Sequence, residues 1–118
     1  MKGKVFLVHW NRQESDILAD MVRSYGWEVA VESEDGARAA RLIKLQKPDA
    51  IVIFLTRQPS HGRETGSTIR SAKATQSIPI IWVDGAEEVI GRTKQAMPDA
   101  IFTNPENLRE ALSKLAHY

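Results

Sequence analysis

The sequence contains no cysteine in 118 residues, which excludes a disulfide scaffold, a thiol nucleophile and a thiolate-ligated zinc site. Long apolar runs are also missing, because no stretch reaches the ~18 residues of a membrane span. The apolar segment behind the basic N-terminus covers only residues 5–8, too short for the core of a signal peptide. We therefore expect a cytoplasmic protein without membrane contact.

An excess of either charge is lacking as well. The 16 Lys and Arg residues against 15 Asp and Glu residues leave a formal net charge of +1. Such a balanced chain has no long-range field that would attract a polyanion, so we do not expect nucleic-acid binding. The length fits a single domain over residues 1–118, large enough to fold without a metal or a disulfide.

The motifs of common cofactor and catalytic sites are missing. A turn that cradles phosphate needs glycine, and residues 9–13, which follow the first apolar segment, contain none. No serine stands in a nucleophile elbow, and His9, His61 and His117 lack the spacing of metal ligands. We expect no cofactor, no metal and no enzymatic activity.

Apolar and amphipathic segments alternate five times along the chain. Short apolar runs are typical of strands buried on both faces, and apolar residues at helical spacing predict helices between them. The predicted strands are residues 4–9, 27–31, 50–55, 78–83 and 99–103, and the predicted helices are 11–25, 33–47, 64–74, 86–96 and 104–115. Strands joined by helices run parallel, with helices on both faces. We expect an α/β fold, a doubly wound, flavodoxin-like five-stranded parallel sheet in a (βα)5 three-layer sandwich.

Polar residues in front of the helical segments predict how the helices begin. Asn11 followed by Glu14 has the spacing of a capping box, and Ser33 is the expected cap of the second helix. Asp84, which precedes a glycine, is expected to cap the fourth helix. Asn104, which precedes a proline, is expected to cap the last helix.

Four segments carry a resemblance to a known family. Residues 4–10, 47–54, 77–84 and 99–105 resemble the first, third, fourth and fifth strands of the response-regulator receiver domain, the CheY-like domain of bacterial two-component systems. The likeness is one of architecture and hydrophobic pattern, and it covers nearly every residue. It implies a receiver fold and a role in phosphorelay signal transduction.

The chain departs from the receiver pattern at the phosphorylation site. The family holds magnesium with two carboxylates after the first strand, phosphorylates an aspartate that ends the third, and places a hydroxyl and a lysine after the fourth and fifth. The residues at these positions are His9, Trp10, Phe54, Asp84 and Asn104, and Ile101 replaces the switch aromatic of the fifth strand. Magnesium needs hard oxygen ligands, and phosphoryl transfer to a carboxylate needs that cation. The resemblance therefore implies a degenerate pseudo-receiver that takes no phosphoryl group.

The altered crevice has two interpretations, which the sequence leaves open. In the first, Trp10, Phe54 and Trp82 fill the hollow that a solvated acidic site would occupy, and His9 is a structural histidine. In the second, the crevice is a pocket for a small ligand. Asp84 is the one carboxylate expected near it, and Phe54 is expected to belong to the core because it lies in the most apolar strand.

A polar segment after the third strand offers a further candidate site. Arg57, His61 and Arg63 lie within seven residues, near the expected crevice and a helix start. Such a group suits an anion or an acidic partner surface. The alternative is a solvated, mobile loop.

These observations support three functions of different classes. The first is a phosphorylation-independent protein-interaction module of bacterial two-component signalling. Its partner would be a kinase, an output domain or a second copy of the chain in a homodimer, bound through the last two helices and the fifth strand. The second is a small-ligand sensor that uses the altered crevice. The third, an enzyme on a flavodoxin-like scaffold, has the least support, because no pair of titratable groups is visibly placed for acid–base chemistry.

Overall fold

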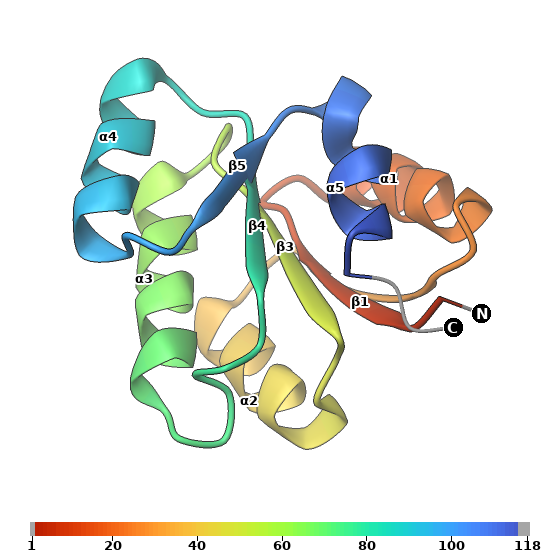
Figure 1. The fold of residues 1–118 in the computed structure, drawn as a ribbon, viewed down its shortest axis with the longest axis horizontal. Helices are drawn as coiled ribbons and strands as arrows, with labels where there is room; N and C mark the ends of the chain where they lie inside the picture. Colours follow the sequence, from red (N-terminus) through yellow and green to blue (C-terminus); the bar gives the residue numbers. More distant parts are fainter. Residues whose placement is uncertain (1, 116–118) are drawn as a thin grey trace.

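The computed structural model describes residues 2–115 and shows a regular alternation of strands and helices (Figure 1). The strands are β1 (Lys4–Val8), β2 (Glu28–Glu32), β3 (Ala50–Phe54), β4 (Ile80–Val83) and β5 (Ile101–Thr103). The helices are α1 (Arg12–Ser24), α2 (Gly36–Gln46), α3 (Pro59–Ser71), α4 (Glu87–Ala96) and α5 (Leu108–Ser113), with a 3-10 turn, η1 (Pro105–Asn107), before α5. Every strand pair is parallel, in the order β2-β1-β3-β4-β5. This is the flavodoxin-like order, and the predicted fold class is confirmed.

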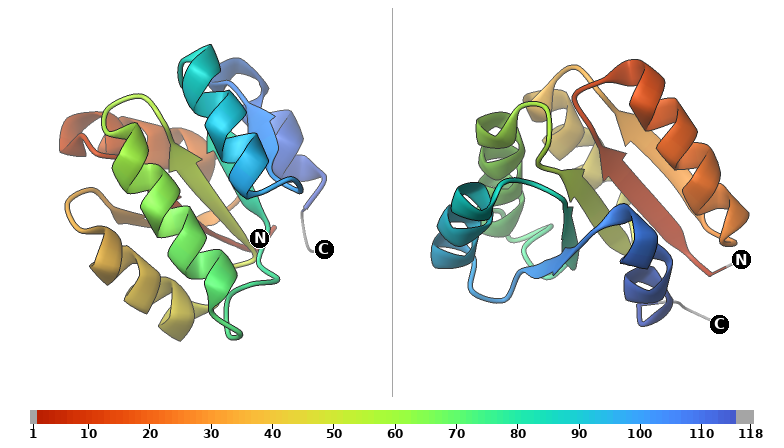
Figure 2. Two further views of the ribbon diagram at one scale, coloured as in Figure 1. Left: turned by 90° about the vertical axis from the view of Figure 1, so that its left-hand side faces the viewer. Right: turned by 90° about the horizontal axis from the view of Figure 1, so that it is seen from above.

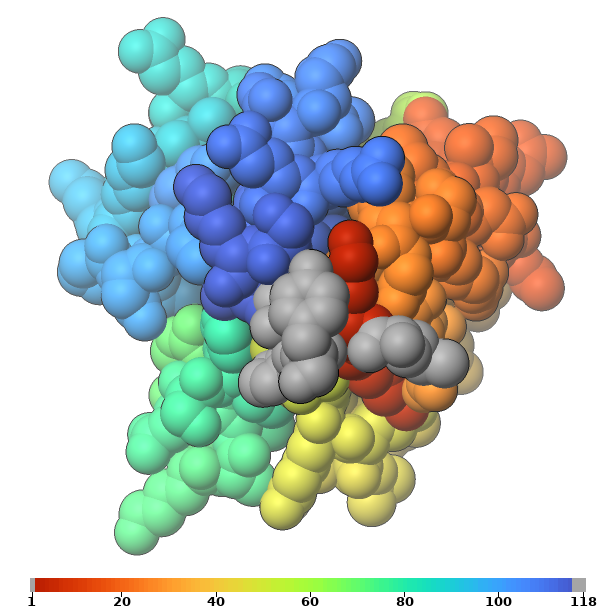
Figure 3. All heavy atoms as spheres, turned by 45° about the vertical axis from the view of Figure 1, so that its right-hand side comes forward, coloured from red at the N-terminus to blue at the C-terminus, as the bar shows by residue number. Residues whose placement is uncertain are grey.

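The sheet separates two apolar cores, because successive side chains of a strand point to opposite faces. On one face, Val5 and Leu7 of β1 pack with residues of α1 and α5. On the other face, Phe6 and Val8 pack with residues of α2 and α3. The two turned views show the helices on both sides of the sheet (Figure 2). In the space-filling view, α1 (orange) and the α5 region (blue) lie on one face with the red N-terminal residues between them (Figure 3).

The largest difference from the sequence prediction is helix α3. It begins at Pro59, whereas the sequence predicted a start at residue 64. A proline is accommodated in the first turn of a helix, where its missing N–H would be unpaired anyway. Gly62 and Gly66 give the segment the composition of a loop, yet both lie where α3 approaches β3 and β4. Strands β4 and β5 each begin two residues later than predicted, at Ile80 and Ile101.

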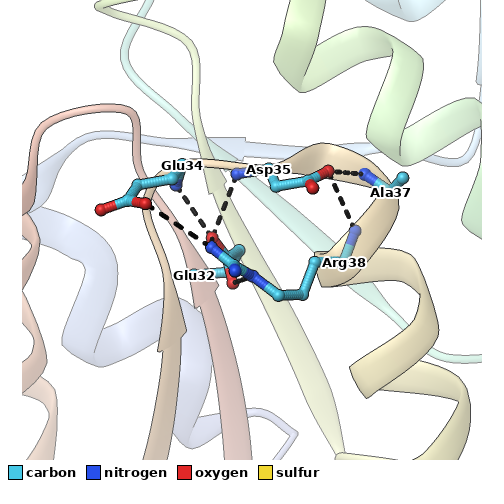
Figure 4. A network of polar contacts seen from close by, with 5 residues as sticks. All are labelled: Glu32, Glu34, Asp35, Ala37 and Arg38. Atoms are coloured by element: carbon cyan, nitrogen blue, oxygen red, sulfur yellow. Dashed lines mark hydrogen bonds and ion pairs between the residues drawn. The ribbon is translucent and has the colours of Figure 1, made fainter.

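A second difference concerns the start of α2, where Asp35 and not Ser33 is the cap. The Asp35 carboxylate accepts hydrogen bonds from the backbone N–H groups of Ala37 and Arg38 at 2.9 and 3.1 Å. Glu32, the last residue of β2, organises the turn before it (Figure 4). Its carboxylate accepts from the backbone N–H groups of Glu34 and Asp35 and from the Arg38 guanidinium, whose Nε lies 2.7 Å from Oε1.

Replacement of Glu32 by Gln should destabilise the fold in a pH-dependent way. The Arg38 hydrogen bond and the two backbone N–H donors lower the pKa of the nearly buried Glu32 carboxyl from 4.5 to about 2. A lowered carboxyl pKa stabilises the fold above pH ~4.5, and that contribution is lost as the pH falls towards 2. Because Arg38 is partly exposed, we expect Glu32→Gln to cost about 1–2 kcal/mol at pH 7, less than the full shift implies. Urea unfolding from pH 7 to pH 3 measures this difference.

The control for this variant is Glu34→Gln on the same network. Glu34 is exposed and lies 3.7 Å from the Arg38 guanidinium, so its loss should change the free energy of unfolding by less than about 1 kcal/mol. A Glu32→Gln deficit that stays constant down to pH 3 would show that the carboxylate charge contributes nothing.

Within residues 2–115, none of the helices has the length and apolarity required to cross a lipid bilayer.

Candidate functional site

The carboxyl ends of the central strands meet at one edge of the sheet, where doubly wound folds place their sites. A pocket of about 520 Å³ opens there. We call it the crevice pocket, and it is lined by His9, Glu14, Ile17, Leu18, Phe54, Thr56, Arg57, Asp84 and Pro105. Three of the predicted crevice residues, His9, Phe54 and Asp84, therefore lie together.

A chain of polar contacts runs along one wall of the crevice pocket. The Arg57 guanidinium donates two hydrogen bonds to the Glu14 carboxylate, with Nε–Oε2 at 2.9 Å and Nη2–Oε1 at 2.6 Å. Nε2 of His9 lies 3.3 Å from Oε2 of the same carboxylate. The Arg57 hydrogen bond holds the pKa of Glu14 below its usual value, so Glu14 and Arg57 form a charged pair of no net charge.

His9 lines the crevice pocket but is itself buried, with 3% of its surface exposed. Its ring stacks on that of Phe54, with the ring centroids 4.7 Å apart. Burial lowers the pKa of His9 below 6.5, and Glu14 opposes this effect. Burial thus favours the neutral imidazole.

Phe54 ends β3 with only 2% of its surface exposed and belongs to the core beneath α1 and α5. Trp82 and Trp10 do not share the hollow with it, so the expectation that three aromatic rings fill the crevice is wrong. Trp82 is fully buried on the opposite face of the sheet. Trp10 also packs on that face, where its ring lies nearly perpendicular to that of His61, with the centroids 5.6 Å apart.

Asp84 follows β4 directly and does not cap α4, which corrects the sequence prediction. The N-cap position is Ala86, and no side chain caps this helix. The Asp84 backbone N–H instead donates to the Thr103 carbonyl at 3.0 Å, which continues the pairing of β4 with β5. Asp84 has a φ of 58°, a left-handed conformation that aspartate tolerates better than most residues.

Glu14 also lines the crevice pocket, although Asp84 was expected to be the one carboxylate there. Its backbone N–H donates to the Asn11 side chain at 3.0 Å, as the capping-box spacing predicts. Its own side chain, however, turns to Arg57 and His9 instead of back to Asn11. Glu14 lies in the first turn of α1, directly after β1 and at the carboxyl edge of the sheet. This position could have indicated that its side chain lines the crevice pocket.

Asn104 caps the turn that precedes α5, because its Oδ1 accepts a hydrogen bond from the Asn107 N–H at 2.9 Å. Its side chain does not line the crevice pocket, although that of Pro105 does.

The structure does not bring Arg57, His61 and Arg63 into one anion site. Arg57 is engaged by Glu14 in the crevice pocket. His61 lines a separate hollow between α2 and α3, together with Glu64 and other residues. His61 and Arg63 lie in α3, so the alternative of a mobile loop is wrong for these two.

Among residues 2–115, no group of three or more His, Asp and Glu side chains is arranged to hold a metal ion. His117, the third histidine of the sequence, lies outside the described residues.

Comparison with known proteins places the fold. No family model matches the chain. It is 26% identical over 95 residues to the transcriptional regulatory protein PdtaR of Mycobacterium tuberculosis, in strains CDC 1551 and H37Rv alike; the aligned region is 80% of this chain and 46% of that protein. The chain thus spans about half the length of the curated relatives it matches.

Solved receiver structures superpose over nearly the whole chain. A putative response regulator of Chloroflexus aurantiacus gives a TM-score of 0.82 at 17% identity, covering 98% of both chains. Chemotaxis protein CheY4 of Vibrio cholerae gives 0.78 at 19% identity, covering 98% of this chain and 99% of the other. The receiver domain of sensor histidine kinase PA1611 of Pseudomonas aeruginosa, with magnesium in its cleft, gives 0.77 at 21% identity, covering 98% of both. The fold is therefore that of response-regulator receiver domains.

Proposed function

We propose that this chain is a receiver-like protein-interaction module of two-component-type signalling that works in the cytoplasm without phosphorylation. The observation that carries the proposal is Phe54, a buried phenyl ring stacked on His9 at the end of the strand where a receiver presents its phosphorylated aspartate. A phenyl group offers no nucleophile, and the His9 imidazole offers magnesium no anionic oxygen. The receiver fold and the similarity to a transcriptional regulatory protein support the signalling context.

The surface proposed for partners is the face of α4, β5 and α5. Strand β5 lies at the edge of the sheet, and Ile101 on it is 38% exposed. Phe102 and Ala111 line a hollow of about 240 Å³ between β5 and α5. Exposed apolar side chains at a sheet edge favour association with another protein, which would be a kinase, an output domain or a second copy of the chain.

The domain should stay unmodified when incubated with acetyl phosphate and magnesium. Intact-mass spectrometry should show no added phosphate, while a receiver domain that has the two carboxylates and the aspartate of the family's phosphorylation site, treated in parallel, serves as the positive control. Proteins captured by the immobilised domain should be the same with and without acetyl phosphate. A stoichiometric, base-labile phosphate adduct would refute the proposal.

A further inference from the structure

The crevice pocket contains a carboxylate that nothing in the described chain neutralises. Asp84 makes no side-chain hydrogen bond or ion pair with any of residues 2–115. Burial and the neighbouring Glu106 carboxylate both raise the pKa of Asp84, so its negative charge is poorly accommodated in the free protein. A cation beside Asp84 would remove that penalty.

The other charged groups of the pocket wall leave Asp84 uncompensated. Glu14 and Arg57 neutralise each other through two hydrogen bonds. Burial lowers the pKa of His9, against the opposing effect of Glu14, and so favours its uncharged form. No lysine lines the pocket, and Arg57 is its one arginine among the described lining residues. The described lining residues therefore leave one negative charge, that of Asp84, at the end of β4.

Apolar side chains form the rest of the wall. The apolar residues that line the pocket are Ile17, Leu18, Phe54 and Pro105. Because Ile17 is 70% exposed, a ligand that covers its side chain would bury apolar surface and so gain binding free energy. The volume of about 520 Å³ lies within the roughly 300–1,000 Å³ of small-molecule sites. Magnesium suits this wall poorly, because it requires a shell of oxygen ligands and the described residues offer no cluster of three metal-binding side chains.

We propose that the crevice pocket binds a small organic ammonium ion, with the cationic head at Asp84 and an apolar body against Ile17, Leu18 and Pro105. The inference goes beyond the proposed interaction function and does not depend on it. The proposed ligand is a cation, opposite in charge to the phosphoryl group that a receiver accepts.

Phenethylamine, protonated at pH 7, is the probe, and 3-phenylpropionate is its anionic counterpart of similar shape. Titration of the ¹⁵N-labelled protein should give saturable amide shifts around His9, Thr56 and Asp84 for the amine and none for the acid. Asp84→Asn keeps a residue that tolerates the left-handed backbone, and it should weaken binding of the amine at least tenfold, or about 1.4 kcal/mol.

A second pair of variants separates the apolar wall from the charge. Ile17→Ala should weaken binding of the amine several-fold, whereas Leu45→Ala, at a residue that is 78% exposed on α2 and does not line the pocket, should not. Equal binding of 3-phenylpropionate, an unchanged affinity of Asp84→Asn or displacement of the amine by millimolar magnesium would each overturn the proposal. Tighter binding of a lysine-containing peptide than of the amine would overturn it in favour of a protein ligand. None of these outcomes depends on phosphorylation, which the intact-mass measurement tests separately.

Discussion

Phe54→Asp should unfold at much lower denaturant concentration than the parent, and it should not turn the domain into a phosphorylated receiver. The new carboxylate would stand where the phenyl ring is buried, in a pocket shared with Asp84 and Glu14. Asn104 supplies no positive charge, and Arg57 is already engaged by Glu14. An uncompensated buried carboxylate near like charges destabilises a fold by several kcal/mol.

The charge can be separated from the loss of the ring by two companion variants. Phe54→Ala removes the ring alone and should cost about 3–5 kcal/mol. Phe54→Asn has the shape of the Asp variant without its charge, so the Asp variant should be the less stable of the two at pH 7. Burial would raise the pKa of the new carboxyl, so its penalty should shrink as the pH falls and the group binds a proton.

Urea unfolding of the three variants at pH 5 and pH 8 measures these differences. If Phe54→Asp is as stable as the parent at both values, the end of β3 is open to water, contrary to the burial of the ring. A phosphate adduct on Phe54→Asp would show that this crevice supports the receiver reaction once an aspartate is restored.

The strands β1, β3 and β4 could be predicted because burial on both faces leaves an unambiguous sequence pattern. Residues 50–54 are apolar without exception, and all five are buried in β3. The start of α2 was harder, since Ser33 and Asp35 are both good caps. The choice depends on Glu32, whose carboxylate accepts two backbone N–H groups of the turn and so delays the helix to Gly36. These contacts are local, between residues two and three positions apart, but Ser33 and Asp35 as candidate caps do not reveal that Glu32 organises the turn.

The candidate site, like the fold, could be predicted from the sequence only in part. The strand ends place His9, Phe54 and Asp84 at one edge, and topology alone predicts this grouping. The pairing of Glu14 with Arg57 joins residues 43 positions apart. The sequence contains many other residues of opposite charge that could pair, and its pattern does not favour Glu14 with Arg57. These two residues meet only because α1 packs beside the turn between β3 and α3.

Helix α3 was predicted too short because its glycines have the composition of a loop. Neither Gly62 nor Gly66 has a positive φ, so the backbone itself does not require glycine there. The packing does, since a Cβ at Gly66 would lie 2.3 Å from Cη2 of Trp82. The indole is fully buried and cannot move away freely. Helix and sheet thus approach more closely than a side chain allows, and composition cannot distinguish this cause from a turn.

Gly66→Ala should therefore destabilise the protein, although alanine is the better helix former by about 1 kcal/mol. Overpacking against a rigid ring costs about 1–3 kcal/mol or more, which exceeds the gain in propensity. Gly91→Ala in α4 is the matched control, because a Cβ there meets nothing within 4 Å. That variant should gain up to about 1 kcal/mol. Thermal and urea unfolding of both variants should therefore give shifts of opposite sign.

A double-mutant cycle with Trp82→Phe identifies the indole as the cause. Trp82→Phe leaves a cavity and is destabilising by itself, but it removes the Cη2 and Cζ2 atoms that a Cβ at Gly66 would meet at 2.3 and 2.6 Å. In that background Gly66→Ala should cost much less than in the parent, with a coupling energy of about 1–3 kcal/mol. Equal costs in both backgrounds would mean that the glycine is required by something other than the Trp82 ring. A coupling of the expected size would show that the contact between α3 and β4 is what excludes a side chain from position 66.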